Sequence, residues 1–416
     1  MKYNKKKYPW ILVGLLWGVA LLNYMDRQML STMEPAMQVD IRELQSAANF
    51  GYLMGIFLWV YGMMSPVSGI IADMFNRKWL IVGSLLVWSG VTFSMGYATT
   101  FHQLYWLRAI MGVSEALYIP AALSLIADFH KEKTRSLAIG IHMTGLYLGQ
   151  AIGGFGATVA ARFSWHAAFH SFGMIGIAYA LVLVAFLREI EKTARFGVSG
   201  RTGVQGKTAI SGGARGLAVL FANGSFWIIL FYFAVASLPG WATKNWLPTL
   251  FARNLHIPMS QAGPLSTITI AAASFCGVIF GGLLSDKWVQ KNIRGRIYSS
   301  AIGLILTIPS LILLGFGHTL FNVVTASVCF GLGYGIFDAN NMPVICQFVS
   351  AKHRGAAYGM LNMTGVFSGA IITDLLGKSS DAGQLGADFA LLAGVVFVAV
   401  LIQLYFLRPK MNDFVD

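Results

Sequence analysis

The chain carries charged side chains in the middle of long apolar segments. Asp26 and Arg27 stand in one such segment, and Arg108 and Glu115 stand in another. A charged residue at the centre of a membrane helix costs about 2.5 to 3.5 kcal/mol, so such residues usually pair, face water or bind a ligand. An arginine can bind a carboxylate through two parallel hydrogen bonds, and a buried carboxylate can take up a proton. The four residues therefore favour the binding of an organic anion together with a proton.

The spacing of these residues predicts their geometry. Arg108 and Glu115 are seven residues apart, so in a helix they share a face at a separation of about 10 Å. Asp26 and Arg27 are adjacent and project about 100° apart, so they cannot both face one cavity. We expect Arg27 and Arg108 to bind the substrate, with Arg108 as its main partner and as the nearest cation of Glu115. Asp26 and Glu115 are the expected proton-coupling carboxylates.

A purely structural role for the same charges is the alternative. Asp26 with Arg108, and Arg27 with Glu115, can neutralise each other and so allow their helices to insert into a membrane. Asp338 and Asp374 are further carboxylates in apolar segments, and we expect Asp374 to lie at the membrane interface.

Other polar and aromatic side chains in apolar segments can contact a hydroxylated ligand. Gln150 and Asn362 can hydrogen-bond to it, Tyr61 can stack on a sugar ring, and Lys244 can supply a second cation. Each also has a packing explanation, as a polar helix contact, an interfacial aromatic residue or a snorkelling lysine. Weaker candidates of the same kind are Tyr147, Trp241, Asn340, Asn341 and, as a proton relay or a packing residue, His142.

Composition places most of the chain in a lipid bilayer, since 56% of its residues are hydrophobic and only 11% are charged. The apolar segments predict an all-α membrane protein with twelve transmembrane helices. The expected spans are Trp10 to Met33, Ala47 to Ala72, Trp79 to Tyr97, Gln103 to Ala127, Ser136 to Ala161, Trp165 to Leu187, Ser225 to Leu250, Ala262 to Leu284, Ile297 to Phe316, Leu320 to Val349, Ala356 to Leu376 and Phe389 to Leu407. The first is expected to be retained rather than cleaved as a signal peptide.

The net charge of +13 is distributed asymmetrically among the gaps between these spans. Nearly all cations fall in one alternating set of gaps, and the other set holds only Arg42, Arg162, Arg253 and Lys378. This positive-inside pattern predicts a multi-pass protein of the cell membrane with both termini in the cytoplasm. The basic charge is thereby explained by orientation and lipid headgroups, and no nucleic-acid partner is expected.

The spans divide into two halves of similar pattern. A hydrophilic segment, 188–224, is predicted to be a cytoplasmic linker between an N-terminal six-helix bundle, 1–187, and a C-terminal six-helix bundle, 225–416. The stretch 128–145 recurs as 347–365 with one residue inserted, which indicates a duplicated, pseudo-symmetric unit. In such repeats the substrate site lies between the halves near the midplane.

A small residue, a carboxylate and two cations occupy the polar gap after the second span. These are Gly69, Asp73, Arg77 and Lys78, and Asp286 repeats the carboxylate in the second half. We expect this set to hold helix ends together and to act as a gate.

These motifs resemble those of the major facilitator superfamily over the full length of the chain. The stretch 69–78 looks like its loop motif and 108–115 looks like its fourth-helix motif. The stretch 145–154 resembles the fifth-helix motif of its antiporters, but Gln150 stands where those usually carry proline, which argues against an antiporter.

Within that superfamily, the chain resembles the anion:cation symporter family, through Asn23-Tyr24-Met25-Asp26-Arg27-Gln28 and Asn245-Trp246-Leu247-Pro248-Thr249. The resemblance implies proton-coupled import of a sugar acid, such as a hexuronate, aldonate or sialic acid, and it puts Gln150 and Asn362 at substrate positions. A Spinster-type lipid transporter shares much of the pattern. A membrane receptor that binds without transport is the third possibility.

No nucleotide-binding loop and no catalytic or metal-binding pattern occurs in the sequence. We therefore expect a secondary active transporter, not an enzyme, that works as a monomer without a cofactor by alternating access.

Overall fold

The protein is described by a computed structural model that covers residues 7–130, 132–189, 220–222, 224–349 and 353–409. Every regular element in these residues is a helix. In the first half they are α1 (Tyr8–Asp40), the 3-10 helix η1 (Arg42–Gln45), α2 (Ala47–Met74), α3 (Arg77–Met95), α4 (Phe101–Ala116), α5 (Tyr118–Phe129), α6 (Glu132–Gly153), α7 (Gly156–Arg162) and α8 (Trp165–Phe186). In the second half they are α11 (Gly224–Leu255), α12 (Met259–Val289), α13 (Gly295–Phe316), α14 (Leu320–Ile345), α15 (Arg354–Asp381) and α16 (Leu385–Phe406).

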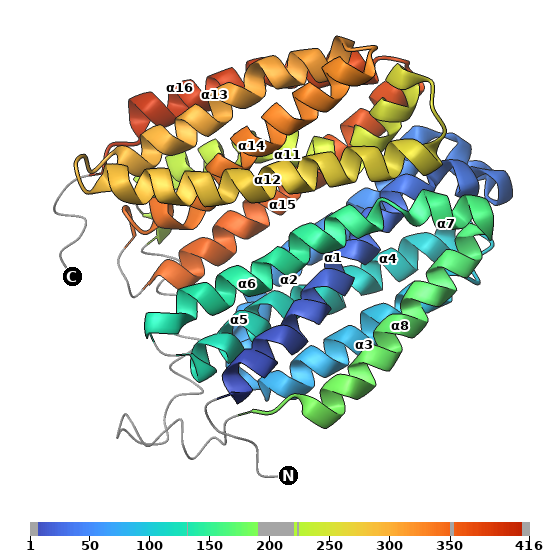
Figure 1. Cartoon of the computed structure of the whole chain (residues 1–416), viewed down its shortest axis with the longest axis horizontal. Helices are drawn as coiled ribbons and strands as arrows, with labels where there is room; N and C mark the ends of the chain where they lie inside the picture. Colours follow the sequence, from blue (N-terminus) through green and yellow to red (C-terminus); the bar gives the residue numbers. More distant parts are fainter. Residues whose placement is uncertain (1–6, 131, 190–219, 223, 350–352, 410–416) are drawn as a thin grey trace.

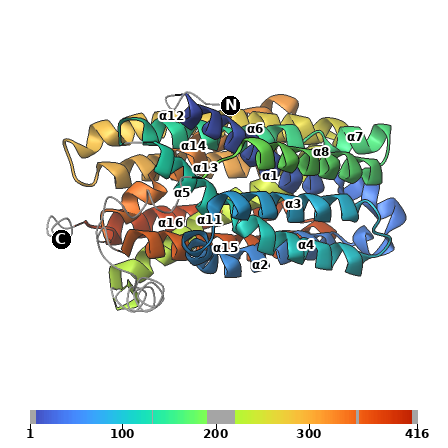
Figure 2. The same cartoon turned by 90° about the horizontal axis from the view of Figure 1, so that it is seen from below.

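The helices confirm the predicted all-α membrane fold. In the described part of the chain, 11 helical segments are long and apolar enough to cross a membrane, and one of them is α4 together with α5. The predicted span that is not among these 11 is the fifth, Ser136 to Ala161, which corresponds to α6 and α7 and has a less apolar sequence. The helix axes run roughly along one common direction, as Figures 1 and 2 show.

Two predicted spans are divided, and the sequence explains both breaks. The fourth span breaks at Leu117 because Pro120 has no N–H to donate to the carbonyl of Ala116. The fifth breaks after Gly153, where Gly154 and Phe155 donate to the carbonyls three residues earlier. The predicted first span is too short, since α1 extends to Asp40 and includes Pro35.

Close helix packing positions the first helix of the chain. The face of α6 that meets α1 carries Gly149 and Gly153, one helical turn apart. A Cβ on Gly149 would come within 2.2 Å of the carbonyl oxygen of Leu21, and one on Gly153 within 2.7 Å of that of Met25. Only glycine allows these backbones to approach so closely, and the contact fixes the segment of α1 that carries the charges.

The helices form two bundles, the first half in blue to green and the second in yellow to red (Figure 1). Among the described helices, the pairs that join them are α2 with α15, α6 and α7 with α12, and α1 with α11 and α12. Helix α1 begins and α16 ends at the same end of the molecule, which we call the terminal end; the other is the opposite end. The predicted linker, 188–224, lies mostly outside the described residues.

The bundles are tied together at the opposite end. Asp381 at the end of α15 accepts hydrogen bonds from the Ser46 hydroxyl (2.7 Å) and from the backbone N–H groups of Ala47 (2.7 Å) and Ala48 (3.0 Å) at the start of α2. The Thr249 hydroxyl also donates to Glu34 at 3.3 Å. Among hydrogen bonds between described residues, the interbundle bond nearest the terminal end is that from Asn362 to Ser65 (3.0 Å). The hydrogen bonds between the bundles therefore lie at the opposite end and along the middle of the helices.

Candidate substrate and proton site

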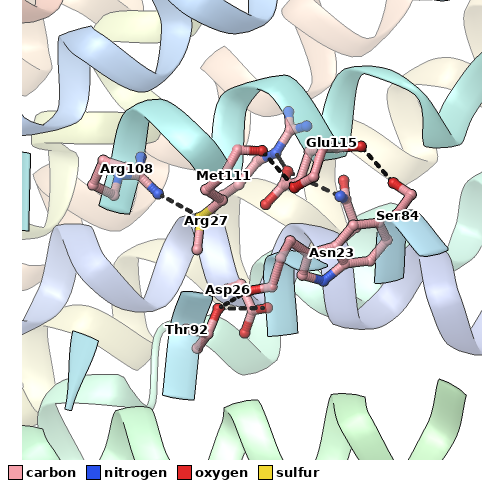
Figure 3. A network of polar contacts seen from close by, with 10 residues as sticks. Asn23, Asp26, Arg27, Ser84, Thr92, Arg108, Met111 and Glu115 are labelled. Atoms are coloured by element: carbon pink, nitrogen blue, oxygen red, sulfur yellow. Dashed lines mark hydrogen bonds and ion pairs between the residues drawn. The ribbon is translucent and has the colours of Figure 1, made fainter. Parts of the chain in front are cut away.

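Glu115 is the centre of a buried polar network between α1 and α4. Its Oε2 accepts a hydrogen bond from Arg27 Nε at 2.6 Å and another from Asn23 Nδ2 at 2.9 Å. The Glu115 side chain is fully buried, whereas that of Arg27 is 13% exposed. Figure 3 shows Arg27 and Asn23 directed at Glu115 from α1. Burial makes this ion pair much less screened than one at a surface.

Aromatic rings surround the guanidinium of Arg27. The guanidinium carbon Cζ lies 5.1 Å from the ring centroid of Tyr24, 4.8 Å from that of Phe57 and 4.6 Å from that of Tyr61. These rings stabilise the cation through their π faces and hold it in place. Among the described residues, the Nη2 nitrogen of Arg27 has no hydrogen-bond partner. This nitrogen is buried in the conformation described and keeps an unused hydrogen-bond donor.

Arg108 occupies a different environment from the one expected. Its side chain is only 3% exposed and lies over Phe57 at 4.5 Å, and its Nη1 donates to the sulfur of Met111 at 3.2 Å. The expectation that Arg108 is the nearest cation of Glu115 is wrong. Arg108 and Glu115 are two turns apart on α4, whereas Arg27 reaches Glu115 from α1 at 2.6 Å. The Arg27–Glu115 pair belongs to the alternative in which charges neutralise each other.

Asp26 is buried without a cation in contact. It is 5% exposed, its Oδ2 accepts a long hydrogen bond of 3.4 Å from Thr92, and its Oδ1 has no partner among the described residues. The expected pairing of Asp26 with Arg108 is not formed. A buried, unpaired carboxylate is costly in its charged form, and a bound proton removes that cost.

Lys244 brings a second cation to the same place from the other bundle. Its Nζ lies 5.9 Å from the ring centroid of Tyr24 and 4.8 Å from that of Trp241. Gln28 of α1 donates to the carbonyl oxygen of Lys244 at 3.0 Å, so α1 and α11 touch here. Tyr24 thus lies between the cations of both bundles.

The remaining expected ligands are distributed around this centre. Tyr61 joins it directly through Arg27, while Gln150 of α6 is 7% exposed. Asn362 donates to Ser65 across the bundles. His142 is fully buried with its Nε2 3.3 Å from the Tyr118 hydroxyl, as a packing residue would be.

The expected gate residues lie at the terminal end. Arg77 pairs with Asp128 and donates to the carbonyl of Ser124, and Lys78 donates to that of Val184 at 2.8 Å, so both connect helices of the first bundle. Asp286 lies 3.5 Å from Arg296 in the second bundle. The side chain of Asp73 lies outside what the structure describes. A Cβ on Gly69 would have no other atom within 4 Å.

Sequence reasoning assigned no role to four residues of the site. Asn23 and Tyr24 were visible only as neighbours of Asp26, and Phe57 is one of 29 phenylalanines. Asp338 was visible as a charge in an apolar segment, but nothing in the sequence indicated that Tyr334, one turn before it, packs against Gly240, one turn before Lys244. Their roles depend on contacts between helices.

Comparison with known proteins identifies the family. The profile of the Major Facilitator Superfamily matches residues 16–373. The hexuronate transporter of Bacillus subtilis is 25% identical over 424 residues, which cover 98% of this chain and 96% of that protein. The D-galactonate transporter of Escherichia coli O6:H1 is 22% identical over 421 residues, which cover 96% and 95%.

A solved structure shares the fold. The crystal structure of a bacterial homologue of the human lysosomal transporter Spinster, inward-facing and unoccupied, superposes with a TM-score of 0.79 at 20% identity and covers 99% of both chains. This likeness concerns the fold alone. Together with the family profile over most of the sequence, it supports one conclusion: the chain belongs to the Major Facilitator Superfamily and is a membrane transporter rather than an enzyme.

Proposed function

We propose that the protein imports a sugar acid with a single carboxylate together with a proton. The observation that carries this proposal is the meeting of Arg27 and Lys244, from opposite bundles, at Tyr24. Two cations that approach one another repel, and an anion between them removes the repulsion. Substrate would thereby draw together the two bundles that must move in transport.

Charge balance supports proton coupling. The cations that this proposal assigns to the central site are Arg27, Arg108 and Lys244, and the carboxylates that it assigns there are Asp26, Glu115 and Asp338. Three cations thus face three carboxylates, so a monovalent anion adds one uncompensated charge. One proton per anion restores neutrality, which lowers the cost of moving the loaded site through the membrane.

The proton-binding groups in this proposal are Asp26 and Glu115. Asp26 has no cation in contact, and Glu115 depends on Arg27. When a substrate carboxylate engages Arg27, Glu115 loses part of its compensation and its protonated form becomes favoured. Arg108, although buried here, is proposed to join the anion site after rearrangement, with Gln150, Asn362 and Tyr61 as contacts to substrate hydroxyl groups and ring.

Alternating access requires that the opposite end opens while the terminal end closes. The Asp381 contacts at the start of α2 would break in that step. Gly69 and its counterpart Gly282 both have open space here, and we propose that they allow helix ends to approach in the other conformation. Asp73, Arg77, Lys78 and Asp286 would brace those ends.

The proposed orientation has the terminal end in the cytoplasm of the cell, from the positive-inside charge pattern. The conformation described is then inward-facing. That the carrier acts as a monomer stays a prediction.

The names of the relatives support the substrate class, since two of them are hexuronate and D-galactonate transporters. The second candidate is the transport of a lipid or amphiphile, which the Spinster-type sequence pattern implies. A lipid carrier needs apolar surface for acyl chains, whereas Arg27, Lys244 and Asp338 make the central region charged, so the sugar acid is the better fit.

Counterflow in proteoliposomes separates the candidates. Purified protein in vesicles loaded with unlabelled D-galactonate or D-glucuronate should take up the labelled acid, and Arg27→Ala should abolish the exchange. Binding without counterflow would indicate a receptor. Movement of a fluorescent lysolipid, with no exchange of either acid, would contradict the proposal and favour the Spinster-type function.

A further inference from the structure

Asp338 is a carboxylate in the space where the proposed function puts an anion. It lies on α14, and its side chain is exposed. One turn before it on the same face of α14, Tyr334 packs against Gly240 of α11, where a Cβ would come within 2.2 Å of the Tyr334 hydroxyl oxygen. Gly240 lies one turn before Lys244, whose carbonyl oxygen accepts a hydrogen bond from Gln28 of the first bundle. The exposed side chain of Asp338 therefore lies on the face of α14 that is directed at α11, beside the contact between the bundles.

Asp338 is held in place, but it does not form a salt bridge. Asn341 Nδ2 donates to its Oδ1 at 3.0 Å. Among the described residues, Lys244 and Asp338 do not form an ion pair with an N–O distance of 4 Å or less. Neither charge is therefore neutralised by direct contact with the other. A ligand can lie between them.

The depths of the two residues fit a six-carbon chain. Helix α11 ends and α14 begins at the opposite end of the molecule. With a rise of about 1.5 Å per residue, Lys244 lies about 16 Å from that end and Asp338 about 27 Å from it. The backbone levels of the two residues thus differ by about 11 Å, a length comparable to a six-carbon chain of about 7 Å with a hydrogen bond at its far end.

We propose that Asp338 determines substrate specificity by contacting the end of the substrate that is opposite to the substrate's carboxylate. An ionised carboxylate only accepts hydrogen bonds. It therefore binds the terminal hydroxyl group of an aldonate or the anomeric hydroxyl group of a hexuronate, and it repels a second carboxylate, as in an aldarate of the same length. Asp338 selects polyhydroxylated monocarboxylates and excludes the corresponding diacids.

This inference rests on the proposed function, and competition assays distinguish the two. Wild-type protein in proteoliposomes is assayed for D-galactonate counterflow in the presence of unlabelled D-galactonate or galactarate, which differ only at the distal carbon. We expect the wild type to prefer galactonate by at least about tenfold, which corresponds to 1.4 kcal/mol. Absence of any galactonate exchange would contradict the proposed function, whereas equal competition by galactarate would contradict the role of Asp338.

Variants of Asp338 test the residue itself. Asp338→Asn should reduce the preference to about threefold or less through improved galactarate competition, and Asp338→Ser should act in the same direction. Asp388→Asn, at the distant start of α16, is the matched control and should keep the wild-type ratio. An unchanged ratio in either variant of Asp338 would overturn the proposal. If neither variant folds, equal competition by galactarate in the wild type would still overturn the proposal.

Discussion

Arg27 and Glu115, 88 residues apart in the chain, form an ion pair of 2.6 Å with no exposed surface on the carboxylate. The contact joins α1 to α4 inside the first bundle. The same guanidinium is the most accessible arginine of the central network, since Arg108 is only 3% exposed. An anion that engages Arg27 must therefore change the surroundings of Glu115, and this relationship is the physical basis for coupling substrate to proton.

Glu115→Gln should retain substrate exchange and lose accumulation. The amide mimics the protonated acid, so the loaded carrier can still change conformation. The glutamine side chain, however, can no longer bind and release a proton in each transport cycle. Counterflow should stay within about threefold of wild type, while uptake driven by a pH gradient should vanish. Asp26→Asn is expected to behave similarly.

Glu43→Gln is the control for these variants because Glu43 is exposed at η1. Full gradient-driven accumulation in the double variant Asp26→Asn, Glu115→Gln would exclude both carboxylates from coupling.

Arg27→Lys should weaken substrate binding about tenfold or more. Lysine lacks the planar fork that can hold Glu115 and a substrate carboxylate at the same time. The measurement is the apparent Kd for D-galactonate from ligand-dependent thermal stabilisation of the purified protein. Arg108→Lys should impair uptake with a smaller change in Kd, because Arg108 is enclosed here. An unchanged Kd in Arg27→Lys, with wild-type behaviour of the exposed control Arg42→Lys, would remove Arg27 from the site.

Asp381→Asn should shift the protein away from the conformation described here. The amide can accept only part of the hydrogen bonds that Asp381 accepts from Ser46, Ala47 and Ala48, and the favourable charge at the start of α2 is lost. Cysteines introduced at the opposite end should react faster with an impermeant maleimide. An equal reaction rate in the variant and in Asp388→Asn would show that Asp381 does not hold that end closed.

Gly69→Val tests the proposed approach of helices at the terminal end. A Cβ on Gly69 meets nothing within 4 Å in this conformation, so the thermal stability of the protein should stay within a few degrees of wild type. Transport should nevertheless fall several-fold, because closure would bring another helix against the added side chain. Gly394→Val in α16, where a Cβ also has free space, should leave both quantities unchanged. Normal transport by Gly69→Val would contradict the assigned role.

Much of the fold could be predicted from the sequence because a protein segment that crosses a bilayer must be a long apolar helix. The central charges Asp26, Arg27, Arg108 and Glu115 were equally legible, because buried charge is rare. Their partners were not. Spacing along α4 suggested that Arg108 serves Glu115, whereas the rotation and depth of α1, set by contacts such as Gly149 against Leu21, bring Arg27 there instead.

The proximity of Lys244 to Tyr24 of the first bundle, and that of Asp338 to the contact between Tyr334 and Gly240, could not be predicted for the same reason. Each residue lies on its own helix, and the hydrophobic periodicity of that helix does not show which residues of other helices lie next to it. The division of the fourth span, in contrast, follows from Pro120 and could have been predicted.

The most direct measurement of the central claim is the accumulation of D-galactonate in proteoliposomes with a pH gradient and no membrane potential. Three cations against three carboxylates require one proton per monovalent anion, so a gradient of one pH unit, acidic outside, should concentrate galactonate about tenfold inside. Equal concentrations on both sides at steady state, with active protein demonstrated by counterflow, would contradict proton-coupled import.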